Sequence, residues 1–272
     1  MSLKSKVSSL TSAQTTGARA VPRPQRAANP TRPAHKTLDF RPKTSDLPFV
    51  LVNMAMTADG KIATANRTIA SFGSKRDHDH LLELRATADA VMSGARTVDS
   101  EKISMGPGGA KYQKHRLKHG LAEFNLRVIV SGSGSIDPRA EVFKHRFSPI
   151  IILTTQRASA KQLSSLRSVA DEVKICGAKV INFSATLLWL RKKYGVKRLL
   201  CEGGGDLNDA MFRAGLVDEL HLTLCPKIFG GRTAPTIAEG AGFETLAAAA
   251  RLELKSTRRA GAEMFLVYGR IG

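Results

Sequence analysis

The sequence is poor in the residues that mark several large classes of protein. Only 3 of its 272 residues are cysteine, and aromatic residues make up 6%. The odd cysteine count and the lack of a CxxC spacing argue against a disulfide framework and a zinc ribbon. No run approaches the roughly 18 consecutive apolar residues of a membrane span, so no membrane partner is expected. The cytoplasm is the default compartment, and organelle targeting by the basic N-terminus stays open.

Acidic residues are also few, and this deficit makes the chain basic. There are 42 Lys and Arg against 23 Asp and Glu, a net charge of +19. Residues 1–48 hold nine Lys or Arg and two Asp, so they carry +7 and the other 224 residues carry +12. Such a surface attracts nucleotides, sugar phosphates or nucleic acid. A nucleic-acid-binding protein is the alternative from another class, which the lack of aromatic interleaving makes less favourable.

The chain divides into a tail and one domain. Residues 1–46 are rich in Ser, Thr, Ala, Arg and Pro, and their prolines preclude a long helix. We expect a disordered basic tail there. Residues 47–272 have the composition of a folded domain that needs neither disulfides nor metal.

Short apolar runs alternate with helical segments along this domain. The runs predict strands at 49–55, 88–93, 126–130, 149–153 and 196–201, and the helices are expected at 74–85, 159–169, 185–194 and 207–214. Three further strands, 218–225, 252–256 and 263–268, end the chain, the last two without a helix between them. The pattern predicts an α/β fold with a mostly parallel sheet and antiparallel C-terminal edge strands.

Three strand ends carry residues suited to ligand binding. Cys201-Glu-Gly-Gly-Gly205 and Ser93-Gly-Ala-Arg-Thr97 place glycines and hydroxyls where a strand leads into a helix. The third strand end, Asn53 to Lys61, offers an acidic and a basic side chain on either side of Gly60. Backbone N–H groups at such positions bind phosphates, and ligands of open α/β sheets bind at carboxyl ends of strands. A tight turn that needs positive φ explains each glycine pattern equally well.

Taken together with Val217-Asp-Glu-Leu220 and Pro226-Lys-Ile-Phe-Gly230, these motifs resemble the riboflavin-biosynthesis reductase domain. The resemblance covers about residues 48–270. It implies a dihydrofolate-reductase-like three-layer fold, NADPH as cofactor and a homodimer. It also implies reduction of the ribosylamino group of a pyrimidine ribose 5′-phosphate to ribitylamino, either on 5-amino-6-(5-phosphoribosylamino)uracil or on its 2,5-diamino precursor. A reductase of a pterin or another heterocycle is the alternative within the same fold.

The resemblance also implies roles for individual residues. It places two residues at the chemistry of the reaction: Lys61 and Glu202. It assigns NADPH binding to Asn53, Met56, Ser93, Gly94, Thr97, Glu101, Gly203, Gly204 and Gly205. It assigns substrate binding to Asp59, Lys61, Arg85 and Glu202. No metal site is expected, because His78-x-His80 and His115-x3-His119 have no matching Cys or carboxylate partners.

One segment departs from the pattern of the family. Thr97 is followed by Val-Asp-Ser-Glu-Lys-Ile-Ser104, which is shorter than the usual run and has no proline. Asp99 or Glu101 would replace the acidic cofactor contact of the family. The departure bears on the identity of the substrate more than on the fold.

Overall fold

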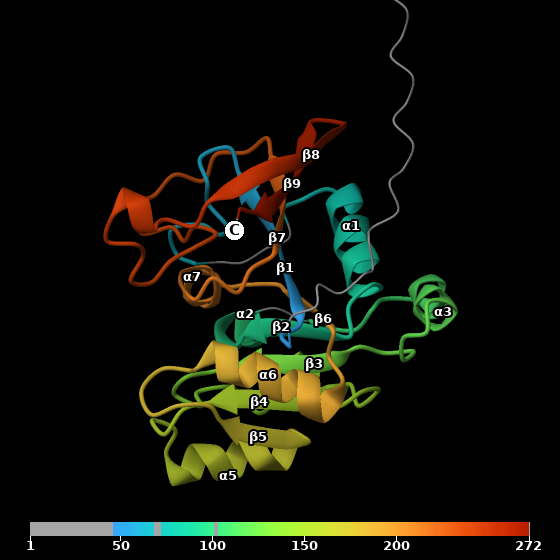
Figure 1. Cartoon of the computed structure of the whole chain (residues 1–272), viewed down its shortest axis with the longest axis vertical. Coiled ribbons are helices and arrows are strands. Elements are labelled where there is room, and N and C mark those ends of the chain that lie inside the picture. The colour runs from blue at the N-terminus through green and yellow to red at the C-terminus, as the bar shows by residue number, and fades with distance from the viewer. Residues whose placement is uncertain (1–45, 68–71, 101–102, 272) are drawn as a thin grey trace, which may run out of the picture. The chain divides into compact units, whose positions relative to one another are not determined.

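The computed structural model describes residues 46–67, 72–100 and 103–271, which form a nine-stranded sheet with helices on both faces (Figure 1). In chain order the elements are β1 (Phe49–Thr57), α1 (Lys75–Arg85), β2 (Ala90–Gly94), α2 (Ala95–Ser100), α3 (Ala110–Lys118), β3 (Leu126–Val130), α4 (Glu141–Lys144), β4 (Ile150–Thr154), α5 (Ala160–Val169), β5 (Glu172–Ile175), α6 (Phe183–Tyr194), β6 (Arg198–Cys201), α7 (Gly205–Arg213), β7 (Glu219–Cys225), a 3-10 turn at Leu246–Ala248, β8 (Leu252–Ala260) and β9 (Glu263–Arg270). The predicted α/β class is confirmed.

The strand order is β5-β4-β3-β2-β6-β1-β7-β9-β8. The pairs from β5 to β7 are parallel, whereas β9 runs antiparallel to β7 and to β8. The predicted antiparallel edge is therefore confirmed. Strand β6 enters the sheet late in the chain, between β1 and β2, with Cys201 in register with Val52 and Met92. The carboxyl ends of these three strands thus become neighbours, as at a topological switch point.

Two apolar clusters hold the three layers together. One packs α6 and α7 on a face of the sheet, and the other packs α1, α2, α4 and α5 on the opposite face. Successive strand residues alternate between the clusters, so that Leu51 belongs to one and Val50 and Val52 to the other, all 0% exposed. On β1 and β7, Asn53 and Thr223 therefore point to the face that α1 covers.

Local sequence explains where several helices begin and end. The Ser74 side chain accepts from the Arg76 and Asp77 amides and caps α1. Ser159 and Gln162 form a capping box on α5, and α6 ends at Gly195 in the left-handed conformation. The Ser74 cap fixes the start of α1, and α1 is the helix that lies over the face of the sheet that carries Asn53.

The described structure also differs from the sequence prediction in places. Strand β5 was not predicted, because its four residues include only two apolar ones, and the short helices α2 and α4 were not predicted either. The predicted tail 1–46 lies outside the described residues apart from its last residue. Within the described ranges, no helix has the length and apolar character needed to cross a bilayer.

Candidate active site

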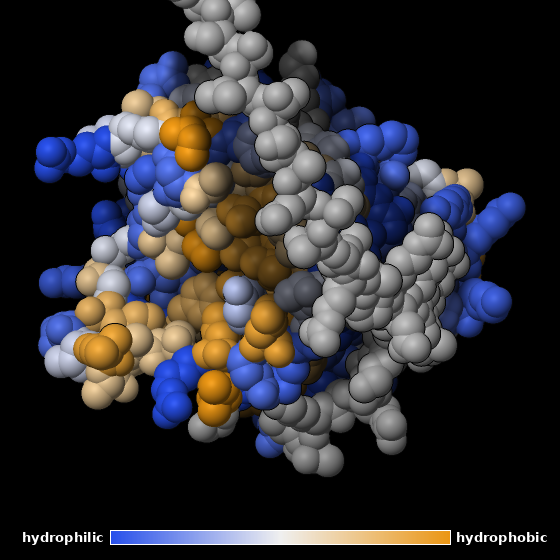
Figure 2. Space-filling model, turned by 90° about the horizontal axis from the view of Figure 1, so that it is seen from above, coloured by the Kyte–Doolittle hydropathy of each residue, from blue (hydrophilic) through white to orange (hydrophobic). Residues whose placement is uncertain are grey.

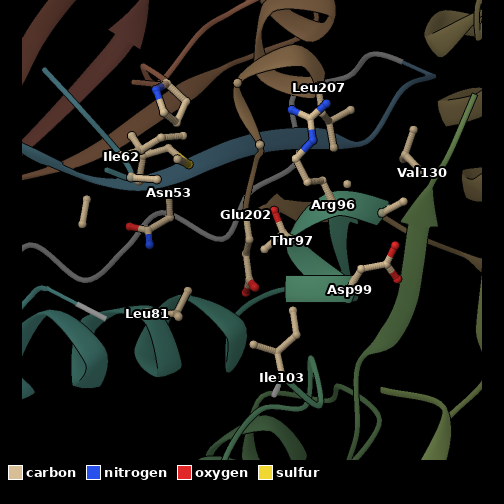
Figure 3. A pocket seen from close by; sticks show the side chains of 18 of the residues that line it. Asn53, Ile62, Leu81, Arg96, Thr97, Asp99, Ile103, Val130, Glu202 and Leu207 are labelled. Carbon is tan, nitrogen blue, oxygen red and sulfur yellow. The ribbon is translucent and has the colours of Figure 1, made fainter. Parts of the chain in front are cut away.

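A cavity of about 1270 Å3 opens over the carboxyl ends of the central strands (Figure 3). Its walls come from β1, from α1, from the turn after β2, from the loop after β3 and from the turn after β6. The residues that line the cavity include Asn53, Asp77, Arg85, Gly94, Thr97, Asp99, Glu202, Gly204 and Gly205. Segments that lie more than 150 residues apart along the chain therefore meet in one space, as the motifs predicted.

A buried ion pair between Arg85 and Glu202 lies in the wall of this cavity. Arg85 Nε and Nη2 lie 2.5 and 2.6 Å from the two carboxylate oxygens of Glu202, and each side chain is 9% exposed. Arg85 Nη1 also donates to the Gly106 carbonyl at 2.9 Å. Bidentate pairing of this kind fixes both side chains in direction as well as in place. The pair joins the end of α1, the turn after β6 and the loop around Gly106.

The three glycines of the turn after β6 differ in what they contact. A Cβ on Gly203 would lie 2.6 Å from Met54 Sδ, and one on Gly205 would lie 2.8 Å from the Thr236 carbonyl. Both glycines are therefore required by packing within the chain. Gly204 lines the cavity and begins α7 without a side-chain cap, so the N-terminal end of that helix faces the cavity.

The turn after β2 lies against this second turn. The Gly94 amide donates to the Gly203 carbonyl at 2.9 Å, and the Glu202 amide donates to the Met92 carbonyl at 2.8 Å. Arg96 pairs with Asp206 at 3.4 Å, with about two-thirds of each side chain exposed. The two predicted glycine turns thus form one continuous wall, with a charged pair at its rim.

Two predicted cofactor contacts carry buried polar atoms without partners. Asn53 is 9% exposed and lines the cavity, and Ser93 is 0% exposed. In the described part of the chain, Asn53 Oδ1 and Ser93 Oγ have no hydrogen-bond partner. Because such atoms are costly to leave unpaired, the Asn53 amide is suited to receive a ligand N–H.

Other predicted residues have their side chains engaged elsewhere. Asp59 accepts from the Thr57 hydroxyl at 2.6 Å and from the Gly230 amide at 2.7 Å, and these bonds lower its pKa, the hydroxyl most. Lys61 Nζ donates to the Ala234 carbonyl at 3.1 Å. Neither residue, nor Met56 or Ser93, belongs to the cavity lining. Their catalytic or binding roles stay predictions.

The predicted acidic cofactor contact falls in a segment that is described only in part. Glu101 lies outside the described residues. Asp99 lines the cavity, and its Oδ1 accepts from the Asp137 amide at 3.0 Å while burial raises its pKa. Cys201 is 0% exposed and burial raises its pKa to about 12, so this thiol is a buried side chain and not a nucleophile.

A further carboxyl group of the cavity was missed by the sequence analysis. Asp77 lines the cavity from the first turn of α1. The helix begins Lys-Arg-Asp-His-Asp-His, and such a run of polar residues predicts side chains that face solvent. The signal that identifies Asp77 is three-dimensional, because only the packing of α1 on β7 shows that this carboxyl is directed inward.

Within the described ranges, no three His, Cys, Asp or Glu side chains come close enough together to hold a metal ion. His78 and His80 lie on α1, while His115 and His119 lie around the end of α3, with ring centroids 4.2 Å apart in the second pair.

Comparison with known proteins agrees with this architecture. A reductase of Methanothermobacter thermautotrophicus, named for 2,5-diamino-6-ribosylamino-4(3H)-pyrimidinone 5′-phosphate, is 33% identical over 81% of this chain and 97% of its own. A solved pyrimidine reductase-like protein of Corynebacterium diphtheriae superposes with a TM-score of 0.71 at 24% identity, covering 83% of this chain and 92% of its own.

A solved bifunctional protein of Thermotoga maritima shares the fold as well. It is described as a diaminohydroxyphosphoribosylaminopyrimidine deaminase and 5-amino-6-(5-phosphoribosylamino)uracil reductase. It superposes with a TM-score of 0.60 at 18% identity, over 83% of this chain and 57% of its own. The profile of the RibD C-terminal domain matches residues 48–266. The chain therefore belongs to the RibD C-terminal domain family.

Proposed function

We propose that this chain is an NADPH-dependent reductase of riboflavin biosynthesis. It converts the ribosylamino group of a pyrimidine ribose 5′-phosphate to a ribitylamino group. The observation that carries the proposal is the fixed Arg85–Glu202 pair beside two glycine turns in one cavity, in a chain 33% identical to a reductase named for such a substrate. We assign the activity to residues 47–272 and regard 1–46 as a tail.

The wall formed by the two glycine turns fits a dinucleotide. The N-terminal end of α7 faces the cavity at Gly204, where the helix dipole and N–H groups favour a pyrophosphate. Gly94 and Thr97 line the same wall. A bound reduced nicotinamide supplies a hydride. The chain orients it against the substrate, and Asn53 Oδ1 is an acceptor at the place where the two ligands meet.

The Arg85–Glu202 pair binds and orients the substrate. Its rigid placement lets the carboxylate face the ribose, and positioning of this kind contributes much of the rate when a cofactor supplies the chemistry. We propose proton handling at Glu202. Lys61, the other predicted group, would have to leave the Ala234 carbonyl in order to act.

The test is oxidation of NADPH by the purified chain with each of two substrates, the 2,5-diamino compound and the deaminated uracil compound. Loss of nicotinamide absorbance together with the mass of a ribityl product would support the proposal, and a parallel assay with NADH tests the cofactor preference. Binding of NADPH without turnover of either compound would contradict it. A variant that lacks residues 1–46 should keep nearly full activity.

We also propose that the chain forms a homodimer. Strand β8 is the edge of the sheet and is exposed along most of its length, including Leu254 at 52%. Figure 2, which looks onto the end of the molecule that carries β8 and β9, shows apolar residues gathered in one area. Light scattering on a sizing column should give twice the chain mass, and a monomer at micromolar concentration would contradict the proposal.

A further inference from the structure

The face of the sheet beneath α1 carries a row of polar side chains, of which the proposed chemistry uses only Asn53. On β7, His221 and Thr223 are each 1% exposed, and His221 is in register with Asn53 on β1. On β9, Glu263 is 5% exposed and follows the same face. Helix α1 lies over this row, and Asp77 is the member of the helix that reaches both the row and the cavity.

Several atoms of this row have no partner. In the described chain, Asn53 Oδ1, Thr223 Oγ1 and His221 Nδ1 form no hydrogen bond. Figure 3 shows the Asn53 amide pointing from β1 toward α1. Three orphaned atoms on one buried face are more than packing alone explains, because each costs free energy unless a ligand supplies a partner.

The charge around Asp77 is also unbalanced. Among the described residues, no Lys or Arg nitrogen lies within ion-pair distance of its carboxyl group. Glu263 accepts hydrogen bonds from the Ser74 amide and hydroxyl at 2.7 and 2.6 Å and from the Cys225 thiol, and it forms no ion pair with another described residue. Burial raises the pKa of Asp77, the charge of Glu263 raises it further, and the charge of the neighbouring His78 lowers it. A carboxyl in these surroundings is best satisfied by N–H donors.

The backbone is shaped to admit this carboxyl. A Cβ on Gly73 would lie 2.2 Å from Asp77 Oδ2, so any side chain at position 73 would displace the Asp77 side chain. Both residues line the cavity. Asp77 is therefore held against the chain at the cavity wall instead of extending into solvent.

We propose that Asp77, with Asn53 beside it and the buried Thr223 behind it, binds the edge of the pyrimidine that carries N3–H and the 2-amino group and thereby selects the 2,5-diamino substrate. This inference rests on the proposed function and adds the identity of its substrate. Two adjacent N–H donors match the two oxygens of a carboxylate. The deaminated compound presents a 2-oxo group at the same place, which repels a carboxylate instead of donating to it.

The test compares the wild type with Asp77→Asn in the full chain, with Asp79→Asn as the matched control on the exposed side of α1. Asp77→Asn should lower kcat/KM for the diamino compound roughly 10- to 100-fold, the loss expected for hydrogen bonds to a charged group. For the uracil compound kcat/KM should stay the same or rise, because the substitution removes the repulsion between the carboxylate and the 2-oxo group. NADPH affinity should not change. Asp79 pairs with Lys75 at 2.9 Å in solvent, so its variant should change neither substrate.

A second variant guards against misfolding. Thr223→Val keeps the shape of the side chain and should lower kcat/KM for the diamino compound by a few-fold, again with little effect on the uracil compound. Equal losses on both substrates, no loss on either, or a wild type that prefers the uracil compound would overturn the assignment of Asp77.

Calorimetric binding of the two compounds to wild type and Asp77→Asn separates this proposal from the proposed function. Asp77-dependent binding of the diamino compound without turnover would overturn the reductase and keep the subsite. Turnover of the diamino compound that Asp77→Asn leaves intact would keep the reductase and overturn the subsite. Equal binding of both compounds by both proteins would also overturn it.

Discussion

The two walls of the cavity differ in how far their polar groups are already bound within the chain. On the strand-end wall, made of Gly94–Thr97 and Glu202–Gly205, both Glu202 oxygens are bound by Arg85 and the Gly94 amide is bound by a carbonyl. On the α1 wall, made of Asn53, Asp77 and the buried Thr223 behind them, orphaned oxygens remain. The first wall, which we call saturated because its charged side chains are paired, keeps its shape without ligand and offers a ligand the backbone N–H groups at the start of α7. The side chains of the second wall gain partners only when a ligand binds.

The largest effect should follow from breaking the saturated wall. Arg85→Ala leaves the buried Glu202 carboxylate unpaired, which typically costs about 3–5 kcal/mol of the free energy of unfolding. Urea denaturation would measure this loss. The double variant Arg85→Met with Glu202→Leu should recover much of the stability although it is inactive. Arg85→Ala with wild-type stability would contradict the view that this pair holds the wall.

Acid should weaken the α1 side of the molecule. Burial, followed by the charges of His221, Arg258 and Arg76, lowers the pKa of His80 from 6.5 to about 4. Between pH 6.5 and pH 4 the His80 imidazole is protonated in the unfolded chain but neutral in the folded chain. The free energy of unfolding therefore falls as the pH drops from 6.5 to 4. The loss is on the order of 3 kcal/mol.

Urea denaturation of wild type and His80→Phe at pH 7 and pH 4.5 would check this. The Phe variant keeps a ring next to Phe265, 5.5 Å from the present imidazole centroid, and should lose less stability on acidification. Equal losses in both proteins would show that another group causes the acid sensitivity.

The proposed cofactor position on the strand-end wall can be tested at one glycine. Gly204 has φ +51, and a Cβ there would project beside Thr97, with Thr97 Oγ1 3.7 Å away. Gly204→Ala should weaken NADPH binding about 10-fold and cost about 1 kcal/mol of strain. Gly195→Ala is the matched control, since Gly195 has φ +68 and open space at the end of α6. Similar NADPH affinities in both variants would argue against this position for the cofactor.

The smallest effect concerns the stability of Asp77→Asn. Because the folded state raises the pKa of Asp77, the ionised side chain opposes folding at pH values above that of the unfolded carboxyl. The Asn variant should melt at the same temperature as the wild type or slightly higher at pH 8. The difference should vanish at acid pH, where both states are neutral. A clearly lower melting temperature at pH 8 would show that the Asp77 charge stabilises the fold.

The sequence was sufficient for the parallel core and the antiparallel edge. Continuous apolar runs such as Phe49–Ala55 and Ile150–Leu153 carry a local signal that survives folding, because buried parallel strands must be apolar on both faces. Strand β5 carries no such signal, since it lies at the edge of the sheet and is only half-buried.

The site was predictable in part, for a different reason. Motifs locate strand ends, and the ends of β1, β2 and β6 do meet in the cavity. Motifs do not give the direction of a side chain, so Lys61 and Asp59 were expected at the cavity although they contact the Ala234 carbonyl and the Gly230 amide. Asp77 was missed because its inward direction depends on the packing of α1 against β7, where Thr223 lies 146 residues further along the chain.

The most direct test of the account is isotope transfer. The chain is incubated with NADPH deuterated at the reactive carbon of the nicotinamide and with the 2,5-diamino ribosylaminopyrimidine phosphate. The account predicts a ribitylamino product that carries one deuterium at C1′, seen by mass spectrometry. A product without deuterium, or no ribityl product while NADPH binds, would contradict the claim that this cavity transfers a hydride to the ribose.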